Sequence, residues 1–284
     1  AANFEWETFM SDENNLIDGF ATQAVHAGAE PDPTTNARVT PIYQTASFTF
    51  ADVDHAASLL CLQAFGIIFT RLTYPTTAVL EQRVAALEGG TGALAVASGH
   101  AAQMLVFHNI MQPGDNFVAA KKLYGGSINQ FSNSFKNFGW EVNWADTDDI
   151  DSFKAAIDDK TKAIFIESLA NPGGVITDIE AIAKIAAEAD VPLIVDNTMA
   201  SPYLCKPFDH GANLVLHSLT KFLGGHGNSM GGIIVENNSF NWSNGNYPMM
   251  SEPRGEYAGV QFHEALGGMG ISFVTAIRAL GLRD

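Results

Sequence analysis

The clearest pattern in the chain is a series of short apolar runs that begins after about residue 90. "ALAVASG" (93–99) is followed by "NFVAA", "EVNWA", "KAIFIES", "VPLIVDN", "NLVLHS" and "GGIIVE". Helical patterns separate most of these runs, as in "ITDIEAIAKIAAEA" (176–189). Continuous apolar strands that alternate with helices are typical of a mostly parallel sheet covered on both faces. The pattern therefore predicts an α/β domain, in which ligands bind at the carboxyl ends of the strands.

The flanking segments have different patterns. Residues 1–60 lack a long periodicity, and Pro31, Pro33 and Pro41 disfavour helix before them, which predicts an extended N-terminal arm. In "TTAVLEQRVAALEGG", one helical face is predicted to carry Leu80, Val84 and Leu87. We expect residues 61–255 to form the main domain and residues 256–284 to begin a linker.

Composition narrows the class of partner. The chain has 284 residues and a net charge of −16, from 31 acidic and 15 basic residues. Such a charge disfavours nucleic acid and anionic membranes as partners. The two cysteines, Cys61 and Cys205, indicate a reducing cytosol, and the acidic first residues do not resemble a signal peptide. A cytoplasmic protein is expected.

Four strand ends carry candidate site residues. Ser98 and Gly99 end one strand and open a helix, whose N-terminus is suited to phosphate. Tyr124 follows a second strand and is available for ring stacking. Asp196 ends a third, strongly apolar strand. Each site also has an ordinary structural explanation. Ser98 and Gly99 fit a plain strand-to-helix turn, and Asp196 fits a cap of the next turn. Tyr124 fits core packing with Ile128, Phe131 and Phe135.

The fourth strand end, "HSLTKFLGGHG", contains Lys221 with two hydroxyls beside it, Ser218 and Thr220. The sequence around Lys221 does not fit the P-loop pattern, in which the lysine is preceded by glycine and followed by serine or threonine. Alone, Lys221 is more typical of an exposed side chain. Together with Asp196, an aromatic ring and a phosphate-ready helix start, it makes up the set that pyridoxal phosphate requires. In that set the lysine forms a Schiff base and the aspartate keeps the pyridine nitrogen protonated.

Other site classes receive less support. None of the eight histidines has H-x-x-x-H or cysteine-paired spacing, so no metal site is predicted. A dinucleotide-binding G-x-G-x-x-G and a nucleophile-elbow G-x-S-x-G are also missing from the sequence.

Several motifs together resemble the Cys/Met-metabolism family of pyridoxal-phosphate enzymes. They are "HAGAEPDPTTNARVTPIYQTASFTF", "RVAALEGG", "LYGG", "VDNT" and "HSLTKFLGGHG". The resemblance extends from about residue 20 to the end of the chain. It implies an aminotransferase-like, fold-type-I large domain that binds pyridoxal 5'-phosphate and assembles as a homodimer or homotetramer with shared active sites.

The resemblance also implies roles for particular residues. Lys221 matches the Schiff-base lysine, Asp196 the pyridinium partner and Tyr124 the stacking tyrosine, with Lys221 and Tyr124 as the catalytic pair. The remaining positions match cofactor contacts: Gly99, His100, Ser218 and Thr220 at the phosphate, Asn171 and Thr198 near the ring, and Arg71 at the phosphate of a neighbouring subunit. At His100, where the family usually has methionine or glutamine, only the backbone N–H is expected to matter.

Three departures from the family pattern stand out. The family's Tyr-Thr-Arg reads Phe69-Thr70-Arg71, and its Asn-Pro-Thr reads Tyr74-Pro75-Thr76. The chain also stops where relatives continue into a smaller C-terminal domain, which carries the arginine that binds the substrate carboxylate. We therefore expect the helix "ISFVTAIRALG" to expose an apolar face of Ile271, Val274, Ile277 and Leu280, and the chain alone to be poorly soluble and inactive.

The segment "DHAASLLCLQAFGIIFTR" is most similar to the O-acetylhomoserine sulfhydrylase branch of this family. The implied reaction replaces the acetoxy group of O-acetyl-L-homoserine with sulfide and yields homocysteine. Cystathionine γ-synthase and methionine γ-lyase activities remain alternatives within the family. An inactive, cofactor-holding interaction module is the alternative from another class.

Overall fold

The computed structural model describes residues 19–282. The acidic start, used above to argue against a signal peptide, lies outside that range. The seven strands are β1 (Gly92–Val96), β2 (Asn116–Ala120), β3 (Glu141–Ala145), β4 (Thr161–Glu167), β5 (Leu193–Asp196), β6 (Leu214–Ser218) and β7 (Gly232–Glu236). Each corresponds to one of the seven apolar runs, so the prediction of a mostly parallel sheet is confirmed.

The sheet has the order β1-β7-β6-β5-β4-β2-β3, and β7 pairs antiparallel with both of its neighbours. The pairs of β2 with β3, β2 with β4, β4 with β5 and β5 with β6 are parallel. Since two antiparallel pairings restore the direction, β1 runs the same way as the parallel strands. The carboxyl ends of β1, β2, β4, β5 and β6 therefore meet at one edge.

Every residue of β2 and of β7 is buried. Because successive side chains of a strand point to opposite faces, complete burial means that both faces of the sheet are covered. The α-helices are α2 (Phe20–His26), α3 (Val53–Leu60), α4 (Pro75–Glu88), α5 (Gly99–Ile110), α6 (Gly125–Asn129), α7 (Ile150–Ala156), α8 (Ile179–Glu188), α9 (Ser201–Leu204), α10 (Pro248–Ser251), α11 (Phe262–Leu266) and α12 (Ser272–Ala276). Shorter π- and 3-10 segments extend α6 and α12 as η2 (Gln130–Ser134), η3 (Phe135–Phe138) and η7 (Ile277–Gly281).

Local sequence signals explain where these helices begin and end. Pro75 occupies the first turn of α4, and Gly89 ends it in the left-handed conformation, with φ of 79°. The Ser98 side chain caps α5 by accepting the Ala101 N–H at 3.0 Å. Asp178 caps α8 in the same way, through the Ala181 N–H at 3.0 Å.

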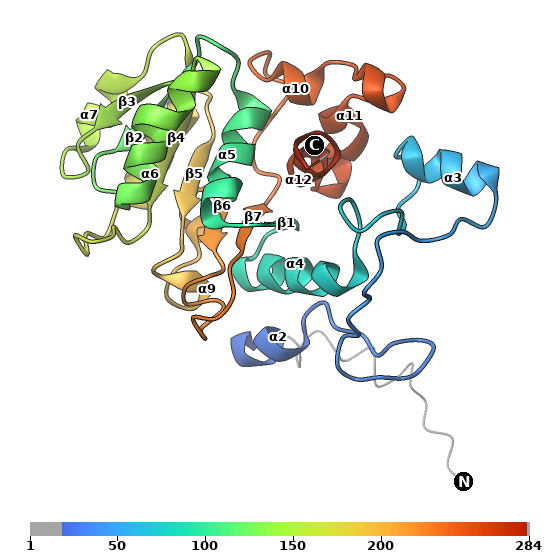
Figure 1. Cartoon of the computed structure of the whole chain (residues 1–284). Helices are drawn as coiled ribbons and strands as arrows, with labels where there is room; N and C mark the ends of the chain where they lie inside the picture. Colours follow the sequence, from blue (N-terminus) through green and yellow to red (C-terminus); the bar gives the residue numbers. More distant parts are fainter. Residues whose placement is uncertain (1–18, 283–284) are drawn as a thin grey trace.

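The arm prediction was only partly right. Two short helices, α2 and α3, lie within residues 19–60, while the proline-containing stretch between them is not helical. Figure 1 shows this segment extending away from the sheet, with α3 set apart from the body of the domain. The predicted helix with Leu80, Val84 and Leu87 is α4, but Leu80 is 39% exposed whereas Val84 and Leu87 are buried.

The C-terminal segment corrects another expectation. Val274 and Ile277 are 4% and 1% exposed, so the apolar face of α12 and η7 is not left open for an absent domain. α12 packs against β1 and β7, and η7 packs against α5. The buried Glu236 carboxylate fixes the start of α12 by accepting the N–H groups of Phe273 at 3.2 Å and Val274 at 2.8 Å. The argument for poor solubility from this face was therefore wrong.

Candidate active site

The edge where the five strand ends meet contains a cavity of about 350 Å³. Its lining includes nine of the ten sequence-predicted site residues: Gly99, His100, Tyr124, Asn171, Asp196, Thr198, Ser218, Thr220 and Lys221. These residues come from five different strand ends, so the sheet topology brings them together. The exception is Arg71, which is not among the lining residues.

The start of α5 forms one wall of the cavity. Ser98 uses its side chain on Ala101, so the N–H groups of Gly99 and His100 remain at the open first turn. A Cβ on Gly99 would lie 2.9 Å from the Ser218 Cβ, closer than real contacts allow. The missing side chain thus lets the helix start approach the hydroxyl-bearing end of β6, which makes a seat for an anion.

The end of β6 supplies the second part of this seat. The Ser218 N–H donates to the Thr198 hydroxyl at 2.8 Å, which ties β6 to the turn after β5. The Thr220 hydroxyl donates to the Gly231 carbonyl at 3.3 Å and accepts the Gly231 N–H at 3.2 Å. Lys221 follows in a turn, with its N–H donating to the Ser218 carbonyl at 3.2 Å. Its side chain is exposed and lines the cavity.

Asp196 is held in place by two donors. One oxygen accepts the Thr198 N–H at 3.0 Å, and the other faces the Gln103 side-chain amide at 3.4 Å. The turn-capping role weighed for Asp196 is therefore real, and it coexists with a position in the cavity wall. Gln103 is itself fixed by donating to the Ser127 hydroxyl at 2.9 Å.

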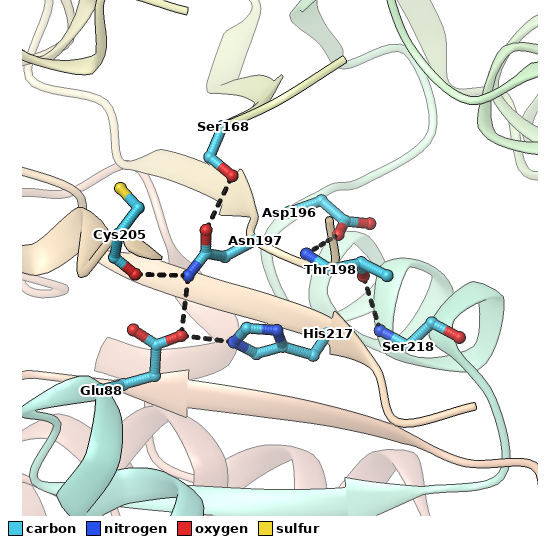
Figure 2. A network of polar contacts seen from close by, with 8 residues as sticks. All are labelled: Glu88, Ser168, Asp196, Asn197, Thr198, Cys205, His217 and Ser218. Carbon is cyan, nitrogen blue, oxygen red and sulfur yellow. Dashed lines mark hydrogen bonds and ion pairs between the residues drawn. The ribbon is translucent and has the colours of Figure 1, made fainter. Parts of the chain in front are cut away.

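A buried network lies beneath the ends of β5 and β6 (Figure 2). Glu88 and His217, both completely buried, contact each other, and Glu88 also accepts the Asn197 side-chain amide at 3.0 Å. Ser168 donates to the Asn197 carbonyl oxygen at 2.7 Å. Figure 2 shows Asn197 and His217 directed toward Glu88, whereas their chain neighbours Asp196 and Ser218 are directed away. Because successive side chains along an extended chain point to opposite sides, Asn197 and His217 join the buried network while Asp196 and Ser218 line the cavity.

Tyr124 is 47% exposed and stands at the start of α6, while Phe131 and Phe135 further along are buried. The core-packing alternative therefore holds for Phe131 and Phe135, whereas the Tyr124 ring is accessible from the cavity. The His100 ring stacks on the Tyr124 ring with centroids 5.8 Å apart and planes at 28°. The expectation that only the backbone of His100 matters did not foresee this ring contact.

The sequence interpretation missed Glu167, which ends β4 and lines the cavity. Burial, and after it the charge of Asp196, raise the pKa of Glu167 to about 7 against the opposing effect of two backbone N–H donors. Glu167 ends the apolar run "KAIFIES" as Asp196 ends "VPLIVD", so the same strand-end argument could have found it.

Arg71 lies elsewhere on the chain surface. Its guanidinium donates to the Leu282 carbonyl at 3.0 Å and stands 5.7 Å from the centre of the Phe69 ring.

Within the part of the chain that the structure describes, no helix is long and apolar enough to cross a membrane.

Comparison with known proteins decides the family. The profile described as "Cys/Met metabolism PLP-dependent enzyme" matches residues 21–279, nearly the whole chain. The chain belongs to the Cys/Met-metabolism family of PLP-dependent enzymes. The O-acetyl-L-homoserine sulfhydrylase of Leptospira meyeri is 51% identical over 93% of this chain and 61% of its own length. O-acetyl-L-homoserine sulfhydrylase 1 of Thermus thermophilus is 47% identical over 93% of this chain and 63% of its own length.

Solved structures of this family agree with the fold. A Campylobacter jejuni chain that contains N'-pyridoxyl-lysine-5'-monophosphate superposes with a TM-score of 0.83 at 36% identity, over 93% of this chain and 69% of that one. The cystathionine γ-lyase of Lactobacillus plantarum gives a TM-score of 0.72 at 32% identity, over 93% and 63%. The chain thus spans about 61–63% of the length of the curated relatives named above.

The residues of the cavity fit pyridoxal phosphate, the cofactor of the family. An amine, a carboxylate, an aromatic ring and an anion seat with two hydroxyls border one space. Because Gly99 has no side chain, the start of α5 approaches the end of β6, and both border that space.

Proposed function

We propose that this chain forms the cofactor-binding part of an O-acetylhomoserine sulfhydrylase. The enzyme breaks the Cγ–O bond of O-acetyl-L-homoserine, forms a Cγ–S bond with sulfide and releases L-homocysteine and acetate. The observation that carries the proposal is the meeting of Lys221, Asp196 and Tyr124 with an anion seat in one cavity. The names of the relatives from Leptospira meyeri and Thermus thermophilus support this choice of substrate.

Each residue has a role that its position supports. When bound, pyridoxal phosphate supplies an electrophilic carbonyl carbon and a ring that stores an electron pair. Lys221 Nζ would hold the cofactor through a covalent bond to that carbon, and its amine would serve as the base that moves the protons of substrate Cα and Cβ. Asp196 keeps the proton on the ring nitrogen. Tyr124 packs on the ring and accepts a proton from the incoming substrate amine.

The remaining contacts orient the cofactor. The N–H groups of Gly99 and His100 and the hydroxyls of Ser218 and Thr220 hold the phosphate, because a helix start and hydroxyl donors both favour an anion. Asn171 and Thr198 border the ring. We take residues 61–255 as the domain that binds it.

We further propose a homodimer or homotetramer in which Arg71 serves the site of a second subunit. Arg71 lies outside the cavity of its own chain, and the arm that precedes it carries strongly exposed apolar side chains, namely Val39, Ile42 and Val53 at 82–83%. Such side chains favour burial against another copy. The free cysteines Cys61 and Cys205 are consistent with the cytoplasmic location that we propose.

Borohydride reduction tests the site directly. The chain loaded with pyridoxal phosphate should carry a reduced pyridoxyl group on Lys221, identified by peptide mass spectrometry. Labelling of Lys184 or any other lysine instead would refute the assignment.

For the reaction, a full-length version should form homocysteine from O-acetylhomoserine and sulfide faster than it forms cystathionine with cysteine or cleaves methionine. Faster turnover in either of those two assays would favour cystathionine γ-synthase or methionine γ-lyase.

An inactive, cofactor-holding module remains a second candidate, because the arginines named next are not placed to bind the substrate carboxylate. Arg38, Arg71, Arg83, Arg254 and Arg278 contact groups outside the cavity, and none of them lines it. No homocysteine from a full-length version that still binds the cofactor would favour this candidate.

A further inference from the structure

Glu167 is a buried carboxylate whose two oxygens serve two different loops. One oxygen accepts the Tyr124 N–H at 2.6 Å, and the other accepts the Asn171 N–H at 3.0 Å. Tyr124 follows β2, whereas Asn171 follows β4. The side chain is only 4% exposed, so water does not compete strongly for either bond.

The position of Glu167 is itself fixed by the sheet. Glu167 pairs with Asp196 in the β4–β5 ladder, and its carbonyl accepts the Thr177 hydroxyl at 2.6 Å. Tyr124 stands at the start of α6, and its backbone N–H has the Glu167 carboxylate as its acceptor. Glu167 therefore transmits the rigidity of β4 to two loops that border the cavity.

From these contacts we infer that Glu167 is a positioning residue for pyridoxal phosphate, and that its carboxylate holds Tyr124 and Asn171 at the separation that the cofactor ring requires. The inference rests on the proposed use of this cavity. Glu167 acts through the two residues that border the ring.

The positioning of Tyr124 and Asn171 by Glu167 should depend on pH, because it requires the ionised carboxylate. Only the ionised form offers two unprotonated oxygens, and burial holds the pKa of Glu167 at about 7. Asp196 pairs with it on the neighbouring strand, and the other titratable groups that line the same cavity are His100, Tyr124 and Lys221. Because the carboxyl pKa is about 7, the group is half ionised near that pH, so positioning approaches completion as the pH rises above it and is lost as the pH falls below it.

The chain offers a matched control for a merely structural role. Glu236 is also buried, also accepts two backbone N–H groups, and burial raises its pKa to about 8, but it does not line the cavity. Glu167→Gln and Glu236→Gln each exchange one acceptor oxygen for an NH₂ group of similar shape. Each change therefore leaves one buried backbone N–H without its acceptor.

The experiment titrates each purified chain with pyridoxal phosphate at pH 8 and records Kd, the visible circular dichroism of the bound cofactor and the Tm of the apo form. We expect Glu167→Gln to raise Kd by about tenfold, the effect of one hydrogen bond to a charged group. We also expect it to change the dichroism, while Glu236→Gln lowers Tm and leaves both cofactor readouts near wild type. At pH 6 the difference between Glu167→Gln and wild type should shrink.

Wild-type Kd and dichroism in Glu167→Gln would overturn the inference, and so would an equal loss in Glu236→Gln. If Glu167→Gln does not fold, Glu167→Asp retains the charge but withdraws both oxygens, and it should show the same loss. Cofactor readouts like wild type in that variant would also overturn the inference. A wild-type chain that binds no pyridoxal phosphate would instead refute the proposed use of the cavity.

Discussion

Replacement of Gly99 by alanine tests the anion seat where the structure is tightest. The new Cβ would lie 2.9 Å from the Ser218 Cβ and 3.2 Å from the Ser218 Cα. The second of these atoms is backbone, so rotation of a side chain cannot relieve the contact. The start of α5 and the end of β6 must therefore move apart by several tenths of an ångström.

That movement separates the two halves of the seat. The helix N–H groups of Gly99 and His100 come from one side, and the hydroxyls of Ser218 and Thr220 come from the other. An anion that keeps its contacts on one side loses about one charge-assisted hydrogen bond on the other, which is worth about 1.5–3 kcal/mol. Since about 1.4 kcal/mol corresponds to a factor of ten, the affinity for pyridoxal phosphate should fall by about 10- to 100-fold.

Fluorescence titration of the apo chain with pyridoxal phosphate and with pyridoxal separates this effect from general damage. Gly99→Ala should lose affinity for the phosphorylated compound and change little toward pyridoxal. Gly125→Ala is the control, because Gly125 also begins a helix near the cavity but has no atom within 4 Å of its Cβ position. An unchanged ratio of the two Kd values in Gly99→Ala would refute the assignment of this wall to the phosphate.

Three other predictions concern assembly, completeness and pH. In a full-length version, mixing Arg71→Ala subunits with Lys221→Ala subunits should restore part of the activity that each lacks alone; no recovery in proven heterodimers would show that Arg71 acts within its own chain. The 284-residue chain should make homocysteine at least about 100-fold more slowly than a full-length version, because no arginine of residues 19–282 lines the cavity to position the substrate carboxylate; comparable rates in a coupled assay would contradict this. Burial raises the pKa of Glu236 from 4.5 to about 8, so the folded state binds the extra proton and stability should fall as pH rises from about 5 to 8. Urea unfolding of Glu236→Gln should show a smaller decrease over that range, and an equal decrease would assign the slope to other groups.

The strands could be predicted from sequence because their burial is continuous. Runs such as "NFVAA" have no polar face, and only a sheet covered on both sides buries such a run completely. Candidate residues at the ends of those strands could be predicted for the same reason, since parallel strands end together. Asp196 and Lys221 were found by this argument.

What sequence could not provide was information that depends on packing between distant segments. Leu80 and Val84 follow the same helical pattern, but only the packing of α4 against β1 decides which one is buried. The apolar face of α12 could equally have met a missing domain or its own sheet. The strand-end argument could have named Glu167 as a candidate, but not its hydrogen bonds to Tyr124 and Asn171, which lie 43 residues before it and 4 residues after it.

The reversed strand β7 has a consequence for the order in which the domain is built. β1 pairs only with β7 in the sheet, and Gly92 pairs with Glu236. The β1 ladder therefore cannot form until the ribosome has synthesised the chain through Glu236. At a synthesis rate of about 5–20 residues per second, β1 and the helix start beside it remain without their partner strand for roughly ten seconds. Long-range pairing of this kind slows folding and exposes strand edges meanwhile. The start of α5 at Gly99 and the turn at Lys221 come together only when β7 inserts between β1 and β6. A nascent chain should therefore bind its cofactor late, after the whole sheet has formed.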